Sequence, residues 1–241
     1  MVHLILTGAT GLVGAATLQA MLTTEAVTRI SILSRRPVAQ AEGQEKAHVI
    51  IHKDYKDYPS QLLEQLKDAQ GVVWALGVSQ NEVSKEQYEE ITYDYPLAAA
   101  KAFSTLHPET PFTFIHISGE GATQTPGMFT PIFGRVKGQV ESALLDLGKA
   151  TPNLKIYNVR PGGVDWRQHP EIHNYMSHQA LYKKAIIPVF SFWKDMTTPT
   201  RPMGKILTEL AMSKGEPLEG KDIGQEGRLV PNVALRRMGG W

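Results

Sequence analysis

The strongest constraint on the fold is a glycine-rich turn near the start of the chain. A short apolar run, residues 2–6, leads directly into Gly8, Gly11 and Gly14, and a second apolar stretch, residues 12–22, follows at once. That order predicts a buried strand, a tight turn and a helix. Gly8 would permit the turn, Gly11 would let phosphates approach the backbone, and Gly14 would let the helix pack close to the strand. A diphosphate would then lie over free N–H groups at the helix N-terminus. We therefore expect a dinucleotide-binding β-α-β unit, in which Thr10, Leu12 and Val13 contact the cofactor beside the three glycines.

Composition excludes several other classes of protein. The 241 residues suffice for one large α/β domain, and 25 basic residues balance 24 acidic ones, so no nucleic-acid or anionic-membrane partner is indicated. The absence of cysteine excludes disulfides and zinc–cysteine sites. No apolar run reaches the ~18 residues of a membrane span, and the start lacks the basic region of a signal peptide. We expect a cytoplasmic protein, with a homodimer as one option.

Apolar runs and helical patterns alternate through residues 1–164. Strands are expected at residues 4–6, 30–33, 49–52, 72–76, 113–117 and 155–159, and helices around 62–66, 97–103, 136–147, 203–212 and 233–238. This alternation predicts a single α/β domain with a doubly wound parallel sheet (a Rossmann fold) and helices on both faces. From residue 165 to 241 the pattern loosens, which predicts a small substrate-side lobe on the same domain. Ligands of such sheets bind beyond the carboxyl ends of the strands.

The ends of the second, third and fourth predicted strands offer contacts for a cofactor. Ser34, Arg35 and Arg36 stand about twenty residues past the glycine turn, where an acidic residue would hold the ribose of NAD. An arginine fork instead matches a 2′-phosphate, so we expect NADP(H). Asp54 follows the third strand and could accept from the adenine amino group. Leu76 and Gly77 end the fourth strand and would let the ribose approach.

The fifth and sixth strands end in residues suited to chemistry. Ser118 and Glu120 follow the fifth strand, and Phe133 and Lys137 lie four residues apart on a predicted helix, so they share a face. Pro161 and Gly162 follow the sixth strand in a turn suited to bordering a nicotinamide.

In this order and spacing, these residues resemble the short-chain dehydrogenase/reductase superfamily over about residues 1–165, and most closely its atypical NAD(P)-binding branch. In that family a serine orients the substrate carbonyl, a tyrosine transfers the proton, and a lysine binds the nicotinamide ribose and lowers the pKa of the tyrosine. The resemblance assigns these roles to Lys137 and to Ser118, with Gly119 or Glu120 as alternatives for the serine. The tyrosine position is Phe133, which cannot donate a proton.

Three functions remain open at this stage. The chain could be a reductase whose acid comes from elsewhere, a non-redox enzyme such as an isomerase or dehydratase that keeps the cofactor, or a binding module that reports NADPH occupancy. We favour an oxidoreductase acting on a small apolar carbonyl or alcohol, because Phe190, Phe192 and Trp193 suit an apolar substrate.

The histidines at 169, 173 and 178 lack a nearby carboxylate pattern, so no metal site is expected. The candidates for the missing acid are Glu120, Tyr93, Tyr95, Tyr175, His173 and an ordered water.

Overall fold

Seven parallel strands form the central sheet of the protein, in the order β3-β2-β1-β4-β5-β6-β9. The structure is a computed structural model that describes residues 1–175 and 196–241. The chain runs outward from β1 to β3, returns to the centre, and then runs outward from β4, so the strand order reverses between β1 and β4. This confirms the predicted doubly wound sheet and all six predicted strands. The strands are β1 (Val2–Thr7), β2 (Val27–Ser34), β3 (Ala47–Ile51), β4 (Gly71–Trp74), β5 (Phe112–Ile117), β6 (Leu154–Val159) and β9 (Leu229–Val230).

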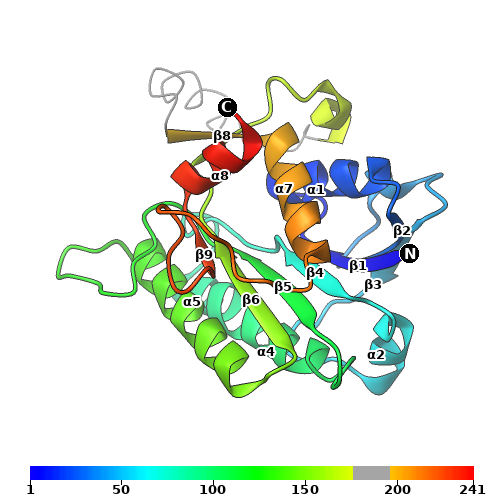
Figure 1. Cartoon of the computed structure of the whole chain (residues 1–241), viewed down its shortest axis with the longest axis horizontal. Coiled ribbons are helices and arrows are strands. Elements are labelled where there is room, and N and C mark those ends of the chain that lie inside the picture. Colours follow the sequence, from blue (N-terminus) through cyan, green and yellow to red (C-terminus); the bar gives the residue numbers. More distant parts are fainter. Residues whose placement is uncertain (176–195) are drawn as a thin grey trace.

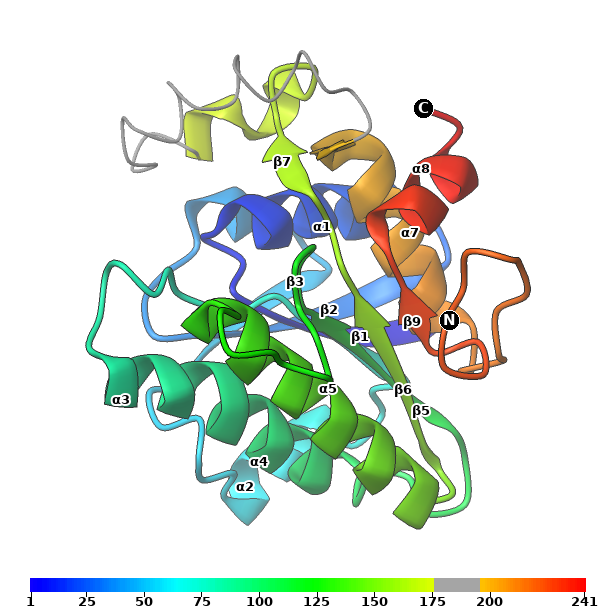
Figure 2. The same ribbon diagram turned by 90° about the vertical axis from the view of Figure 1, so that its left-hand side faces the viewer.

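Helices cover both faces of this sheet, as Figures 1 and 2 show. One face carries α1 (Leu12–Thr23) and α7 (Thr200–Met212), and the other carries α2 (Ser60–Leu66), α4 (Tyr95–Phe103) and α5 (Ile132–Ala150). Because successive strand side chains point to opposite faces, Leu4 and Leu6 pack beneath α1 and α7, whereas Ile5 packs beneath the other layer. Burial on both sides explains why the strands are apolar throughout.

The helix that ends with α4 begins earlier than its apolar pattern indicated. Helical backbone runs through α3 (Lys85–Glu89) and a π turn, η2 (Glu90–Asp94), before it enters α4. Ser84 begins it with a capping box, since its hydroxyl accepts from Gln87 N–H and the Gln87 side chain accepts from Ser84 N–H. The π turn precedes Pro96, which lies in the first turn of α4 and has no N–H to donate.

The tail of the chain, predicted as a substrate-side lobe, also completes the core. Helix α7 packs along α1, and β9 extends the sheet beside β6. Strands β7 (Gly163–Asp165) and β8 (Thr197–Pro199) form a separate parallel pair.

No helix within residues 1–175 and 196–241 has the length and apolar character needed to cross a membrane. The remaining elements are η1 (Ala39–Ala41), η3 (Pro170–Tyr175) and α8 (Asn232–Gly239).

Candidate functional site

A cleft of about 1090 Å³ opens at the carboxyl ends of β1, β4, β5 and β6, where the strand order reverses. This is the edge at which doubly wound sheets bind ligands. The loops that follow these four strands and the face of α5 supply most of its walls. Ten residues predicted for the site line it: Gly11, Leu12, Val13, Leu76, Gly77, Ser118, Glu120, Lys137, Pro161 and Gly162.

The glycine turn forms the wall that follows β1. Gly8 has a φ of +68°, and a Cβ there would lie 2.3 Å from the carbonyl oxygen of Ala75 at the end of β4. A Cβ at Gly14 would lie 2.1 Å from the Gly8 oxygen, so both glycines allow the turn, sheet and helix to meet. Gly11 is the N-cap of α1, where no side chain caps the helix and no acidic residue occupies the first turn. The first N–H groups of α1 therefore remain suited to an anion.

The residues predicted to select NADP(H) lie outside the lining of this cleft, at the ends of β2 and β3. Ser34 Oγ donates to the Arg36 carbonyl at 2.7 Å, which shapes the turn after β2. Arg35 and Arg36 are exposed, and neither guanidinium makes a hydrogen bond or ion pair to a residue that the structure describes. Asp54 is exposed as well, and its carboxylate accepts from Lys56 N–H at 2.9 Å. Thr10, like Gly8 and Gly14, does not line the cleft.

Close packing of a loop on α5 brings Lys137 to Ser118. A Cβ at Gly138 would lie 1.7 Å from the carbonyl oxygen of Thr123, and Thr123 N–H donates to the Gly134 carbonyl at 3.0 Å. The loop after β5 thus lies directly on the helix. Lys137 Nζ donates to the Ser118 carbonyl at 2.6 Å. The Ser118 side chain is buried, and its hydroxyl has no hydrogen-bond partner within the described residues.

Buried polar groups behind the cleft set its electrostatics. Glu141, fully buried one turn along α5 from Lys137, accepts from Nε and Nη2 of Arg160 at 2.8 and 2.5 Å. Burial lowers the pKa of Lys137 to about 8, against the opposing charge of Glu141. Burial also lowers the pKa of His116 to about 4, although its hydrogen bond to the side-chain oxygen Oδ1 of Asn158 favours the charged form. At neutral pH His116 is therefore uncharged, and the Glu141 charge is matched by Arg160.

Four of the side chains considered as substitutes for the missing tyrosine do not line the cleft. Tyr95 stacks on Tyr55 with ring centroids 5.8 Å apart, and His173 Nε2 lies 3.0 Å from the Trp166 carbonyl oxygen. Tyr175, at the end of η3, and Tyr93 are also absent from the lining.

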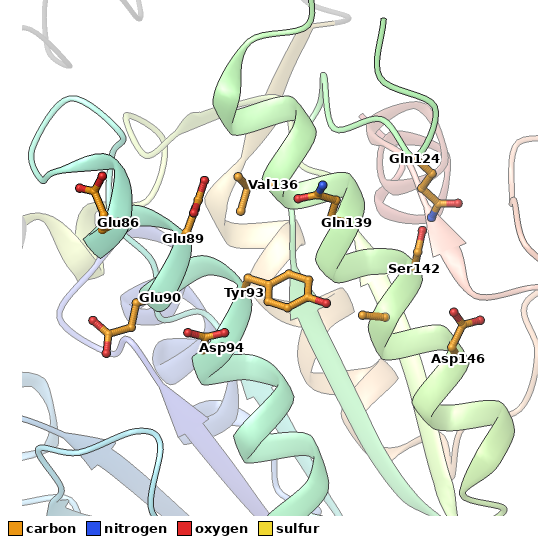
Figure 3. Close-up of a pocket in the computed structure, with 11 residues that line it drawn as sticks. Glu86, Glu89, Glu90, Tyr93, Asp94, Gln124, Val136, Gln139, Ser142 and Asp146 are labelled. Atoms are coloured by element: carbon orange, nitrogen blue, oxygen red, sulfur yellow. The ribbon is translucent and has the colours of Figure 1, made fainter.

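Tyr93 instead lines a second hollow, between the α3–η2 segment and α5 (Figure 3). This hollow is acidic, with the carboxylates of Glu86, Glu89, Glu90, Asp94 and Asp146 around it.

Of the predicted acids, Glu120 is the one that reaches the cleft. Its Oε2 lies 3.4 Å from the N–H of Asn232, at the start of α8. Phe133 also lines the cleft, and its ring packs beside Gly121, where a Cβ would lie 3.1 Å from the ring tip.

The sequence did not identify the residues that the tail contributes to the cleft. The aromatic and apolar content of the tail indicated a substrate side, but an irregular pattern does not say which positions face a ligand. His178, Phe190, Phe192 and Trp193 lie outside the described residues. Residues 1–175 and 196–241 bring no three potential metal ligands together. The tail residues in the lining are Trp166, Met196, Thr197, Asn232 and Val233.

Comparison with known proteins identifies relatives of the chain by sequence. No protein-family model matches the chain. Leucinostatins biosynthesis cluster protein T of Purpureocillium lilacinum is 32% identical over 258 residues, covering 97% of the chain and 94% of that protein. Botcinic acid biosynthesis cluster B protein 16 of Botryotinia fuckeliana (strain B05.10) is 36% identical over 154 residues, covering 60% of the chain and 98% of that protein.

Solved structures share the fold at much lower identity. An oxidoreductase of the short-chain dehydrogenase/reductase family from Burkholderia thailandensis superposes with a TM-score of 0.66 at 14% identity, covering 97% of the chain and 92% of that protein. The match to the leucinostatins protein over nearly the full length of both chains shows that the chain belongs to the same family as that fungal biosynthesis cluster protein. The solved structure shows that the chain has the fold of short-chain dehydrogenases/reductases.

Proposed function

We propose that the protein is an NADP(H)-dependent oxidoreductase that acts on a small apolar carbonyl compound or alcohol. The observation that carries the proposal is the cleft at the switch point, which has the glycine turn on one wall and Lys137 with Ser118 on another. An uncapped helix N-terminus fits a diphosphate, and a half-buried ammonium beside a strand end fits ribose hydroxyls.

Within this proposal, each wall has its own role. Gly11 and the start of α1 hold the diphosphate, Leu76 and Gly77 border a ribose, and Pro161 and Gly162 border the nicotinamide. Arg35 and Arg36 bind the 2′-phosphate. When bound, the cofactor supplies or accepts the hydride. Apolar groups of the tail, such as Trp166 and Val233, exclude water and favour an apolar substrate.

The diphosphate site is tested by a matched pair of substitutions at Gly11. Asparagine and aspartate both suit a helix N-cap, and a Cβ at this position meets only the Gly8 oxygen, at 3.3 Å. Both variants should keep the melting temperature of the cofactor-free protein. Gly11→Asp should bind NADPH far more weakly than Gly11→Asn in isothermal titration, because its carboxylate repels the diphosphate. Equal affinities for the two variants would contradict this placement.

The chemistry is tested by the absorbance of NADPH with a panel of apolar ketones and aldehydes. Consumption of NADPH with conversion of a carbonyl to an alcohol is the expected result. Binding without consumption, together with conversion of a substrate, would favour a non-redox enzyme. Binding without any conversion would favour a module that reports NADPH.

A further inference from the structure

The cleft contains no tyrosine or histidine among the described residues, so a proton donor for a reduction is sought here among the other groups that line it. The hydroxyls of its serines and threonine are very weak acids. Glu82 and Glu120 carry exposed carboxylates, and that of Glu120 accepts from Asn232 N–H. An ionised carboxylate only accepts hydrogen bonds. Within residues 1–175 and 196–241, Lys137 is the one ammonium in this lining.

The position of Lys137 suits proton transfer. Its Nζ is held by the Ser118 carbonyl at 2.6 Å, which occupies one of the three N–H groups of an ammonium. A second can bind a ribose hydroxyl, and the third remains for a substrate oxygen. The neighbouring Gly119 carries no side chain, and even a Cβ there would stand 3.5 Å from Nζ. Phe133, one turn earlier on α5, contributes a ring without a hydroxyl to the same cleft.

We propose that Lys137 itself donates the proton to the substrate oxygen, in the role that a tyrosine fills in related enzymes. The proposal rests on the oxidoreductase function, because a hydride must reach the carbonyl carbon. As that C–H bond forms, the carbonyl π electrons move to oxygen, an N–H bond of Lys137 breaks and an O–H bond forms. Lys137 is left as a neutral amine, and water returns its proton.

The charges around Lys137 agree with this role. Burial brings the pKa of its ammonium down to about 8, so the proton leaves more readily than from a surface lysine. Glu141 on the same helix opposes that shift, but its carboxylate is paired with Arg160 from the end of β6. His116 on β5 is uncharged at neutral pH and contributes no competing proton. Carbonyl reduction should therefore slow as the pH rises through about 8, and alcohol oxidation should accelerate.

Two measurements test the proposal on the whole protein loaded with NADPH. The first is the NMR titration of ¹³Cε-labelled lysines, in which the resonance lost in Lys137→Arg identifies Lys137. Its midpoint should lie near 8, not near the ~10.4 of an ordinary lysine. The second is the rate of phenanthrenequinone reduction against pH. Lys137→Arg should keep NADPH affinity within a few-fold, lose ~10²–10⁴ in rate and lose the decline above pH 8.

Two further variants show whether a loss of rate reflects the missing acid. Gln139→Ala, exposed on the same helix, should leave rate and pH profile unchanged. The double variant Lys137→Arg, Phe133→Tyr should regain rate, because a phenol then stands in the position that the family uses.

The outcomes separate this proposal from the one on which it rests. A Lys137 resonance with an ordinary midpoint, or Lys137→Arg with the natural rate and pH profile, would overturn the proton transfer alone. A natural protein that binds NADPH but reduces no carbonyl would overturn the oxidoreductase function, and the proton transfer with it.

Discussion

At the residue scale, the proposed preference for NADP(H) depends on Arg35 and Arg36. Both are exposed after β2, the strand next to β1, and neither is bound by another described side chain. They are therefore available to a phosphate, which arginine binds with two charge-assisted hydrogen bonds. An acidic residue, the usual partner of the NAD ribose, is absent at this strand end.

We predict that the protein binds NADPH roughly ten- to a hundredfold more tightly than NADH, since a hydrogen bond to a charged group contributes ~1.5–3 kcal/mol. The double variant Arg35→Ala, Arg36→Ala should lose this preference in isothermal titration. A control that removes two exposed lysines that do not line the cleft, Lys101→Ala with Lys149→Ala, should keep this preference. An unchanged preference for NADPH in the arginine variant would show that another group binds the 2′-phosphate.

Some functional residues were visible in the sequence because their spacing is distinctive, and others were not. Gly8, Gly11 and Gly14 follow an apolar run at fixed intervals, and Lys137 falls at a fixed distance from Phe133. Glu141 gave no comparable signal, since a glutamate on a helix ordinarily faces water. Its burial depends on Arg160, nineteen residues later in the chain, and that contact exists only once α5 packs on β6.

At the element scale, the strands that could be predicted from the sequence were those formed by apolar runs. The first six strands are such runs, whereas β7, β8 and β9 have only three, three and two residues, too few for any periodicity. Strand β9 also pairs with β6 from about seventy residues away, so its place depends on tertiary contacts. Helix α3 was missed because its sequence, KEQYE, is almost entirely polar.

Helix α5 and the loop after β5 depend on Gly138 for their contact. Alanine normally favours a helix over glycine by ~1 kcal/mol. We nevertheless predict that Gly138→Ala lowers the melting temperature and weakens NADPH binding, because the new methyl group would lie 1.7 Å from the Thr123 oxygen and push the loop away from Lys137. Thermal unfolding and calorimetry measure both effects. Gln139→Ala serves as the control on an exposed position of the same helix; a stabilised Gly138→Ala variant would contradict the proposed contact.

At the scale of the whole molecule, two buried histidines join neighbouring strands across the sheet. His3 on β1 lies 2.8 Å from the Ser31 hydroxyl on β2, and His116 on β5 lies 2.9 Å from the Asn158 side chain on β6. Burial lowers the pKa of each histidine to about 4. Both are uncharged in the folded protein at neutral pH, and both take up protons on unfolding in mild acid.

The direction in which the free energy of unfolding changes with pH depends on how many protons the folded and the unfolded chain bind. An unfolded histidine binds its proton below a pH of about 6.5, whereas the folded ones do so only near 4. Between these values the unfolded chain holds more protons, so acid favours unfolding. With about 1.4 kcal/mol per proton and pH unit, the two sites together should lower the free energy of unfolding by up to about 2.7 kcal/mol per pH unit. The stability they provide is complete above 6.5 and is lost as the pH falls toward 4.

Urea unfolding at a series of pH values measures this dependence, and glutamine variants assign it. Glutamine keeps a hydrogen-bonding amide but does not titrate, so His3→Gln and His116→Gln should each remove about half of the slope that these two sites provide. Part of the slope should remain in the double variant, because burial also lowers the pKa of His52 and of His169. Because the two sites lie on opposite halves of the sheet, equal losses from both would show that the sheet unfolds as one cooperative unit. An undiminished slope in the double variant would place the acid sensitivity elsewhere in the molecule.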